Sequence, residues 1–204
     1  MITKNKLLLA SSSASRLELM RNSRIPFEVI TQTADEAQCD WGLPLQQLTQ
    51  NIALAKMEHA ILPQGIQGQI CFVLTADTLG QDVHGVTHGK PTSYEDAVSK
   101  LKVARDGMLT CCTSFCLDKK IFVDGAWQLE TRIVESVEGG LLFVVPDDWI
   151  EQYLQNSSAL SASGAITIEG YGDMFLKSVS GSYSTIVGLP MFEVRQALSK
   201  LGFF

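Results

Sequence analysis

The charged residues that could do chemistry stand inside or directly after apolar runs. Asp77 follows the apolar run 70–74, in the stretch Thr75-Ala76-Asp77-Thr78. Open α/β sheets place their active groups just beyond the carboxyl end of a buried strand, so Asp77 is a candidate general base or metal ligand. An Asp in that place also commonly starts a turn. Both interpretations stay open at the level of the sequence.

A second candidate lies near the N-terminus, where the apolar run 7–10 leads into three serines and then Arg16. This pattern predicts a buried strand that runs into a helix beginning near Ser13. Unpaired backbone N–H groups, the hydroxyls of Ser11 to Ser13 and a fixed cation together suit a phosphate group. The same residues fit a plain capped helix after a core strand, because serine is a preferred N-cap.

Two lysines and two histidines could also take part. Lys56 lies inside the helical pattern 45–61, either as a ligand or as an edge residue whose ammonium group reaches solvent. Gly89-Lys90-Pro91 is either a phosphate-binding loop or simply a loop. His84 and His88, with Asp82 nearby, allow a metal site to be drawn, although a hairpin position favours exposure to solvent. The sequence has no P-loop, no GxGxxG and no G-x-S-x-G motif.

Composition limits the class of protein. The chain has 204 residues and a hydrophobic fraction of 46%, which is ordinary for a globular protein. Its net charge of −6 argues against a nucleic-acid polymer as partner, because such a partner usually requires a basic surface. No apolar run approaches the roughly 18 residues of a membrane span, and the run 7–10 is too short for a signal peptide. The protein is therefore expected to be cytoplasmic, with no membrane partner. The five cysteines form no CxxC pair, and Cys111, Cys112 and Cys116 are expected in the core.

Strand and helix patterns alternate along the chain. Extended segments are predicted at 7–10, 26–30 and 70–74, a turn at 83–86, and helices at 13–22, 45–61, 94–104, 146–155 and 190–201. Residues 108–145 predict several antiparallel strands, broken at Asp124-Gly125 and at Gly139-Gly140. The expected fold is α/β, with residues 1–204 forming a single domain of two lobes around a central cleft.

Taken together, these residues resemble the Maf family in order and spacing. The matching stretches are Leu9-Ala10-Ser11-Ser12-Ser13 with Arg16, Asp35-Glu36, Ala53-x-x-Lys56, Ala76-Asp77-Thr78, Gly89-Lys90-Pro91 and Gly181-Ser182-Tyr183-Ser184 with Val187-Gly188-Leu189-Pro190. The resemblance implies an elongated mixed α/β sheet of the Maf/inosine-triphosphatase type. It also implies a cytosolic homodimer that hydrolyses a nucleoside triphosphate to the monophosphate and pyrophosphate with a divalent metal, Mg²⁺ or Mn²⁺.

The resemblance also implies roles for single residues. Asp77 resembles the proton acceptor, and Ser11, Glu36 and Asp77 look like the group around the metal. A triphosphate clamp is implied for a second set: Ser13, Arg16, Lys56 and Lys90. Cations along the phosphates stabilise charge that moves onto the leaving pyrophosphate, and carboxylates hold the metal and accept a proton from water.

The sequence departs from the family at positions implied to select the base, which are Ser15, Thr78 and Glu169. Ser15 replaces the usual Arg, and Glu169 replaces the usual Gln. An ionised Glu only accepts hydrogen bonds, so guanine-type or cytosine-type nucleotides are expected to be preferred over uridine and thymidine triphosphates. Glu169 could instead point to solvent or pair with a cation. These departures leave one alternative function: a catalytically silent Maf-like regulator of cell division that binds a nucleotide or a protein.

Overall fold

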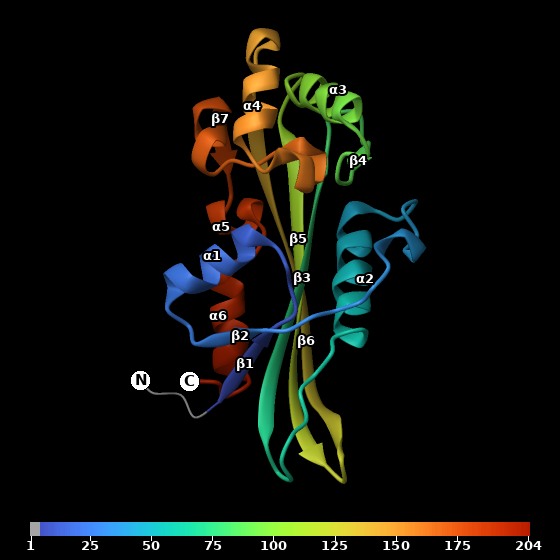
Figure 1. Cartoon of the computed structure of the whole chain (residues 1–204), viewed down its shortest axis with the longest axis vertical. Coiled ribbons are helices and arrows are strands. Elements are labelled where there is room, and N and C mark those ends of the chain that lie inside the picture. Colours follow the sequence, from blue (N-terminus) through green and yellow to red (C-terminus); the bar gives the residue numbers. More distant parts are fainter. Residues whose placement is uncertain (1–4) are drawn as a thin grey trace. The chain divides into compact units, whose positions relative to one another are not determined.

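The computed structural model describes residues 5–204, which form a mixed α/β structure around a seven-stranded sheet (Figure 1). The strand order is β2-β1-β3-β5-β6-β7, with β4 paired to β3. The strands are β1 (Lys6–Leu9), β2 (Phe27–Val29), β3 (Ile70–Gln81), β4 (Thr87–His88), β5 (Leu109–Val123), β6 (Ala126–Phe143) and β7 (Leu176–Ser180). β1 pairs in parallel with β2 and β3, and β7 pairs antiparallel with β6, so the sheet is mixed.

Six α-helices accompany the described strands: α1 (Ala14–Ser23), α2 (Leu45–Glu58), α3 (Tyr94–Ala104), α4 (Ile150–Asn156), α5 (Tyr183–Val187) and α6 (Met191–Lys200). Short 3-10 helices are η1 (Glu36–Gln38), η2 (Asp147–Trp149), η3 (Ala159–Ser161), η4 (Ser163–Ala165) and η5 (Gly170–Phe175). The predicted helices are confirmed, with ends shifted by a few residues. None of the helices in residues 5–204 is long and apolar enough to cross a membrane.

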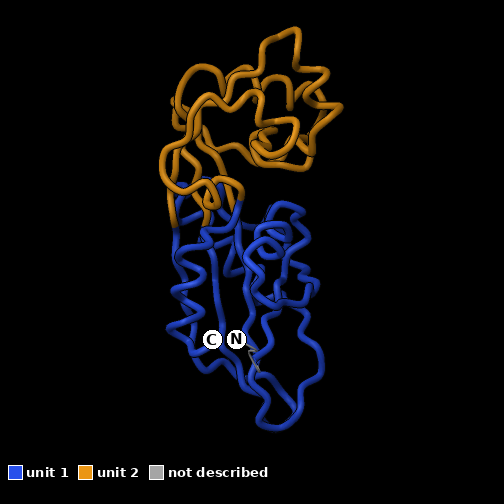
Figure 2. The backbone as a smooth tube through the Cα atoms, turned by 90° about the vertical axis from the view of Figure 1, so that its left-hand side faces the viewer, with its two compact units in different colours: residues 1–77, 114–136, 188–204 blue, residues 78–113, 137–187 orange. Residues whose placement is uncertain are grey.

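The chain divides into two compact units, each assembled from separate stretches of sequence (Figure 2). Unit 1 consists of residues 1–77, 114–136 and 188–204, and unit 2 of residues 78–113 and 137–187. The strands β3, β5 and β6 contribute residues to both units.

Unit 1 buries its sheet on both faces, which explains the uninterrupted apolar runs of β1 and β3. Successive side chains of a strand point to opposite faces. One face of β1 and β3 therefore forms a first core, made by Leu7, Leu9, Phe72 and Leu74. Met20 of α1 and Val194 of α6 pack into the same core. Leu8 belongs to a second core with Cys71, Val73 and Met57 of α2. Helix α2 thus packs against the face that carries the odd-numbered residues of β3.

Unit 2 has its own aromatic core. Tyr153 of α4 is fully buried and packs edge-on against Phe175, and both rings contact Phe143 of β6. The Tyr153 hydroxyl lies 2.9 Å from the Thr167 N–H, from which it accepts, and 3.2 Å from the Ala165 carbonyl oxygen, to which it donates. These bonds hold the irregular segment 163–169 against α4.

Two predictions for the strands are wrong. β3 does not end at residue 74 but continues to Gln81, where it pairs with β4, so Asp77 lies inside a strand. Residues 108–145 form two long strands rather than several. The turn at Asp124-Gly125 is confirmed, since both residues have positive φ, whereas Gly139-Gly140 lies within β6. A Cβ at Gly139 would come within 3.0 Å of the Ser180 carbonyl oxygen, so this glycine permits close approach of β7 instead of breaking the strand.

Unit 1 also contains a charge network that the sequence analysis did not predict. Asp118 of β5 has a fully buried carboxylate, and Arg132 of β6 donates to both of its oxygens at 2.7 and 2.8 Å. Lys120 adds an ion pair at 3.0 Å, and Arg132 also reaches Glu58 at the end of α2. Burial alone would raise the pKa of Asp118, but the bonds from Arg132 and Lys120 outweigh it, and the pKa is lowered.

This network makes stability dependent on pH. Because the folded-state pKa of Asp118 is depressed, its contribution is present above the unfolded value of about 3.9 and is lost as pH falls through the folded value. Arg132→Met removes the main partner, so acid unfolding followed by circular dichroism should begin at a higher pH than in the wild type. Arg105→Met, which breaks an exposed pair with Asp147, serves as the control and should leave the acid transition nearly unchanged.

Candidate active site

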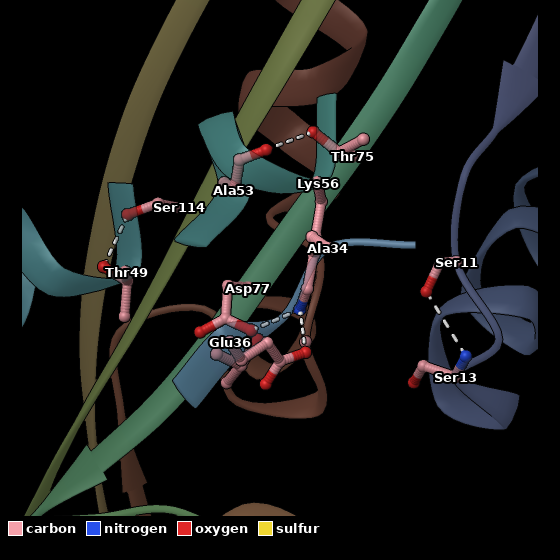
Figure 3. Close-up of polar contacts among 12 residues, drawn as sticks. Ser11, Ser13, Ala34, Glu36, Thr49, Ala53, Lys56, Thr75, Asp77 and Ser114 are labelled. Atoms are coloured by element: carbon pink, nitrogen blue, oxygen red, sulfur yellow. Dashed lines mark hydrogen bonds and ion pairs between the residues drawn. The ribbon is translucent and has the colours of Figure 1, made fainter. Parts of the chain in front are cut away.

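Asp77 reaches the centre of the candidate site because of the alternation of β3. Thr75 and Asp77 continue the series Cys71 and Val73, which faces α2. The Thr75 hydroxyl donates to the Ala53 carbonyl oxygen of α2 at 2.8 Å, and the Asp77 carboxylate lies against the same helix (Figure 3). Asp77 is 5% exposed. The face of the strand, and not its end, therefore brings the Asp77 side chain to α2.

Lys56 is held on the buried face of α2. The buried residues of this helix recur at spacings of three and four, as expected for one helical face: Leu45, Leu48, Thr49, Ile52, Ala53, Lys56 and Met57. The Lys56 Nζ lies 2.6 Å from Asp77 Oδ1 and 2.9 Å from Glu36 Oε1. At 6% exposure, Lys56 does not reach into solvent, so its interpretation as an edge residue is wrong.

Glu36 comes to the site from η1. Asp35 caps this short helix by accepting from the Ala37 N–H at 3.1 Å, and the Trp41 indole donates to the Glu36 carbonyl oxygen at 3.2 Å. These contacts fix the backbone from which the Glu36 carboxylate extends towards Lys56 (Figure 3). We call Glu36, Lys56 and Asp77 the carboxylate–lysine trio.

The trio leaves one carboxylate oxygen with capacity to bind. Asp77 Oδ2 is buried and has no hydrogen-bond partner among the described residues. Burial, followed by the negative charges of Asp77 and Glu36, raises the pKa of the nearby Cys39 thiol, and Lys56 offsets this only in part. The trio thus presents negative charge and an oxygen that can accept a proton or a cation.

A hydroxyl pair fixes α2 against the sheet at one further point. Thr49 of α2 and Ser114 of β5 are hydrogen-bonded at 2.6 Å (Figure 3). Ser114 is also bonded to Ser136 of β6, at 2.7 Å. With the Thr75–Ala53 bond, these contacts set the height of Lys56 over Asp77. The sequence analysis missed these residues, although hydroxyls at the buried positions of α2 and β3 were a visible signal.

The N-terminal candidates lie elsewhere in unit 1. Ser13 is the N-cap of α1, since its Oγ accepts from the Arg16 N–H at 3.4 Å, and Ser15 lies in the first turn of that helix. Ser11 Oγ accepts from the Ser13 N–H at 3.2 Å, and Figure 3 shows both serines apart from the trio. The Arg16 guanidinium is buried and donates through Nε to the Gly188 carbonyl oxygen at 2.7 Å. The capped-helix interpretation is therefore confirmed for this segment.

Lys90, Thr78 and Glu169 belong to unit 2. Lys90 is exposed, and two hydrogen bonds anchor its loop. The Gly164 N–H donates to the Gly89 carbonyl oxygen at 3.1 Å, and the Ser163 hydroxyl donates to the His88 carbonyl oxygen. Thr78 is half-buried and bonds to Thr113 at 2.9 Å. Glu169 Oε2 accepts from the Ile168 N–H at 3.0 Å. One oxygen of the Glu169 carboxylate is thereby bonded to the backbone of the preceding residue. The sequence analysis did not predict this bond.

The remaining candidates do not build a metal centre. Within residues 5–204, no group of three or more His, Cys, Asp or Glu side chains could hold a metal ion. His88 Nε2 pairs with Asp82 Oδ2 at 2.8 Å, and His84 is exposed in the predicted turn. Cys111, Cys112 and Cys116 are buried free thiols, as expected.

Comparison with known proteins identifies the family of this chain and several relatives. The sequence model of the Maf-like protein family matches residues 6–201. The chain is 28% identical to a dTTP/UTP pyrophosphatase of Caldicellulosiruptor saccharolyticus, over 97% of this chain and 96% of that protein. It is 30% identical to a dTTP/UTP pyrophosphatase of Ruminiclostridium cellulolyticum, covering 96% and 95%. A nucleoside triphosphate pyrophosphatase of Rickettsia felis is 28% identical, covering 97% and 93%. With nearly its whole length matched by the family model, the chain belongs to the Maf-like protein family.

Proposed function

We propose that this protein is a nucleoside triphosphate pyrophosphatase that hydrolyses the bond between the α- and β-phosphates. The observation that carries the proposal is the carboxylate–lysine trio, in which the buried Asp77 keeps one oxygen, Oδ2, without a partner among the described residues. The relatives, which are named pyrophosphatases of nucleoside triphosphates, support the same activity. A silent nucleotide-binding protein has no need of a buried carboxylate held in this way.

Asp77 is the proposed general base. Lys56 occupies Oδ1 at 2.6 Å, which orients the carboxylate and leaves Oδ2 to accept a proton from water. The oxygen of that water forms the new bond to the α-phosphorus, the bond from the α-phosphorus to the bridging oxygen breaks, and pyrophosphate leaves. The products are a nucleoside monophosphate and pyrophosphate.

The proposed cofactor is Mg²⁺ or Mn²⁺, and the residues present fit such an ion. The carboxylates of Glu36 and Asp77 would supply oxygen ligands, and the resemblance assigns Ser11 to the same group. Mg²⁺ typically takes only one or two carboxylates and completes its shell with water and substrate phosphates. When bound, the ion would neutralise phosphate charge.

The metal can be tested without measuring hydrolysis, because Cys39 senses the local charge. Adding Mg²⁺ or Mn²⁺ should lower the pKa of Cys39, which the carboxylates raise, and so increase its alkylation by iodoacetamide near pH 8. The other four cysteines are buried and serve as internal references in the mass spectrum. Glu36→Gln should weaken the response. An alkylation rate that saturating metal leaves unchanged in the wild type would contradict a metal at the trio.

The proposed triphosphate clamp consists of Arg16, Lys56, Lys90 and Ser13, as the resemblance implies. Lys56 has its charge shared between two carboxylates, and the Arg16 guanidinium donates through Nε to the Gly188 carbonyl oxygen. Lys90 is exposed and the most accessible of these cations. Homodimer formation and a cytoplasmic location remain predictions.

For the base, we propose uridine and thymidine triphosphates as the preferred substrates. Two of the relatives above are named dTTP/UTP pyrophosphatases, which runs against the expected preference for guanine or cytosine. The argument for that expectation also weakens, because Glu169 accepts a bond from its neighbouring backbone and is not simply an open acceptor. Ser15 and Thr78 remain the other proposed specificity residues.

The deciding experiment measures pyrophosphate release from canonical and modified nucleoside triphosphates in the presence of Mg²⁺ or Mn²⁺. We expect dTTP and UTP to have the highest kcat/KM. A preference for guanine or cytosine nucleotides would instead support the role that the sequence analysis gave to Glu169, which is to accept hydrogen bonds from the base. Release from no member of the panel would favour the silent regulator.

A further inference from the structure

The loop that carries Lys90 is fixed through its backbone by one segment of unit 2. The Ser163 hydroxyl donates to the His88 carbonyl oxygen at 2.5 Å. The Gly164 N–H donates to the next carbonyl oxygen along the loop, that of Gly89, at 3.1 Å. Two successive residues of η4 therefore hold the two carbonyl groups that directly precede Lys90.

This donor segment is itself anchored in the core of unit 2. Tyr153 of α4 is fully buried, and its hydroxyl is bonded to the Ala165 carbonyl oxygen at 3.2 Å and to the Thr167 N–H at 2.9 Å. Gly164 is buried, and a Cβ built on it would lie 3.9 Å from the His88 Cβ. The segment thus packs closely against the loop, on a support that the buried tyrosine fixes.

The Lys90 loop is also fixed on its N-terminal side, whereas the lysine side chain is exposed. His88 ends β4, and its Nε2 pairs with Asp82 Oδ2 at 2.8 Å. Lys100 Nζ lies 3.5 Å from the Lys90 carbonyl oxygen, which is at the limit of a hydrogen bond and adds little. These contacts hold the backbone of the loop and leave the Lys90 side chain exposed.

We propose that Ser163 is a positioning residue that fixes the Lys90 loop for binding the triphosphate of the substrate. This inference rests on the proposed function, in which Lys90 belongs to the triphosphate clamp. Lysine places a compact charge on a flexible side chain, and ordering flexible groups on binding costs affinity. When the backbone is fixed beforehand, only the side chain remains to be ordered. The hydroxyl of Ser163 is the group that this role requires, since it bonds the carbonyl oxygen of His88.

The test measures binding of the non-cleavable α,β-methylene analogues of UTP and CTP by calorimetry, with Mg²⁺ present. Ser163→Ala removes the donor to the His88 carbonyl oxygen. We expect the Kd of each analogue to rise about 3- to 10-fold, the size of one lost hydrogen bond. The factor should be the same for both analogues, because they share the triphosphate and differ only in the base.

Two variants show whether the lost hydroxyl is the cause. Ser163→Thr keeps a hydroxyl at this position and should retain the wild-type Kd values. Ser161→Ala is the matched control, because it removes a hydroxyl that donates to the Ser158 carbonyl oxygen at 2.8 Å, outside the Lys90 loop. It should leave both Kd values unchanged. Should Ser163→Ala fail to fold, as judged by circular dichroism, Ser163→Cys supplies a side chain of similar size with only a weak donor.

A double-mutant cycle shows whether Ser163 acts through Lys90. Lys90→Met removes the ammonium group and should itself weaken binding of both analogues. In that background the position of the loop no longer places a charge, so Ser163→Ala should cause no further rise in Kd. A merely structural role of Ser163 would give the same rise in both backgrounds.

Four results would overturn the proposal. They are unchanged Kd values in the folded Ser163 variant, an equal rise with and without the Lys90 ammonium group, a changed ratio of the two Kd values, and a wild type that binds neither analogue. A changed ratio would mean that Ser163 acts on recognition of the base. Failure of the proposed function looks different. If the Kd values respond as expected but pyrophosphate is released from no triphosphate, the pyrophosphatase activity is wrong and the role of Ser163 stands.

Discussion

Asp77→Asn should keep the fold and lose about 10²- to 10⁴-fold in turnover, the usual effect of removing a general base. The amide has nearly the same shape, and its oxygen can still accept from Lys56, which lies 2.6 Å from Asp77 Oδ1. The atom that replaces Oδ2 is then an NH₂ group, which cannot take a proton from water. The loss should therefore appear in kcat more than in KM when pyrophosphate release is measured over a range of substrate concentrations.

The matched control for this variant is Asp96→Asn. Asp96 lies in the first turn of α3 in unit 2, and its carboxylate pairs with Lys100. Turnover of the control should match the wild type. If Asp77→Asn itself keeps a near-native rate while the melting temperature is unchanged, the base is another group. Glu36→Gln would then be the first variant to measure.

Lys56→Met should reduce both stability and turnover. Removing one partner of a buried ion pair leaves an uncompensated charge, which destabilises proteins by roughly 3–5 kcal/mol. The Lys56 and Asp77 side chains are each 7% exposed, so this value applies to their pair. The Glu36 side chain is 35% exposed, and its contact adds less because solvent screens it. Urea unfolding would measure the change in free energy of unfolding. Turnover should fall because Asp77 loses the group that orients it.

Lys119→Met provides the comparison, since Lys119 and Glu130 form a more exposed pair at 3.2 Å. That substitution should change the free energy of unfolding by no more than about 1 kcal/mol. If Lys56→Met is as mild as the control and turnover is retained, then the trio does not hold Asp77 in the way described above.

Several features of the molecule could be predicted from local sequence. The apolar runs of β1 and β3, the Ser13 and Ser93 caps and the Asp124-Gly125 turn all depend on residues within a few positions of one another. The motifs in sequence order also identified the family, which the family model confirms over residues 6–201. Asp77, Lys56 and Glu36 were all named as candidates on this basis.

Where the apolar pattern failed, pairing between strands decided the outcome. Gly139-Gly140 has the composition of a break, but β7 passes so close to Gly139 that the strand needs a residue without a Cβ. The apolar run of β3 stops at residue 74, but the strand continues to Gln81, where it pairs with the short strand β4 that follows it. In both places a partner strand supplies hydrogen bonds that the apolar pattern of the strand itself does not show.

The sequence by itself determined which residue types could do chemistry, and it placed Lys56 on a helix. It also put Thr75 and Asp77 two positions apart, so that both share one face of any strand that continues through them, because the period of 2 is a property of the backbone. Only the tertiary structure decided that β3 continues through Asp77 and that α2 packs on that face, so that Lys56 meets two carboxylates 20 and 21 positions away from it in the chain. The physical reason is that burial and hydrogen-bond partners arise from packing, which joins segments whose separation along the sequence carries no signal of contact.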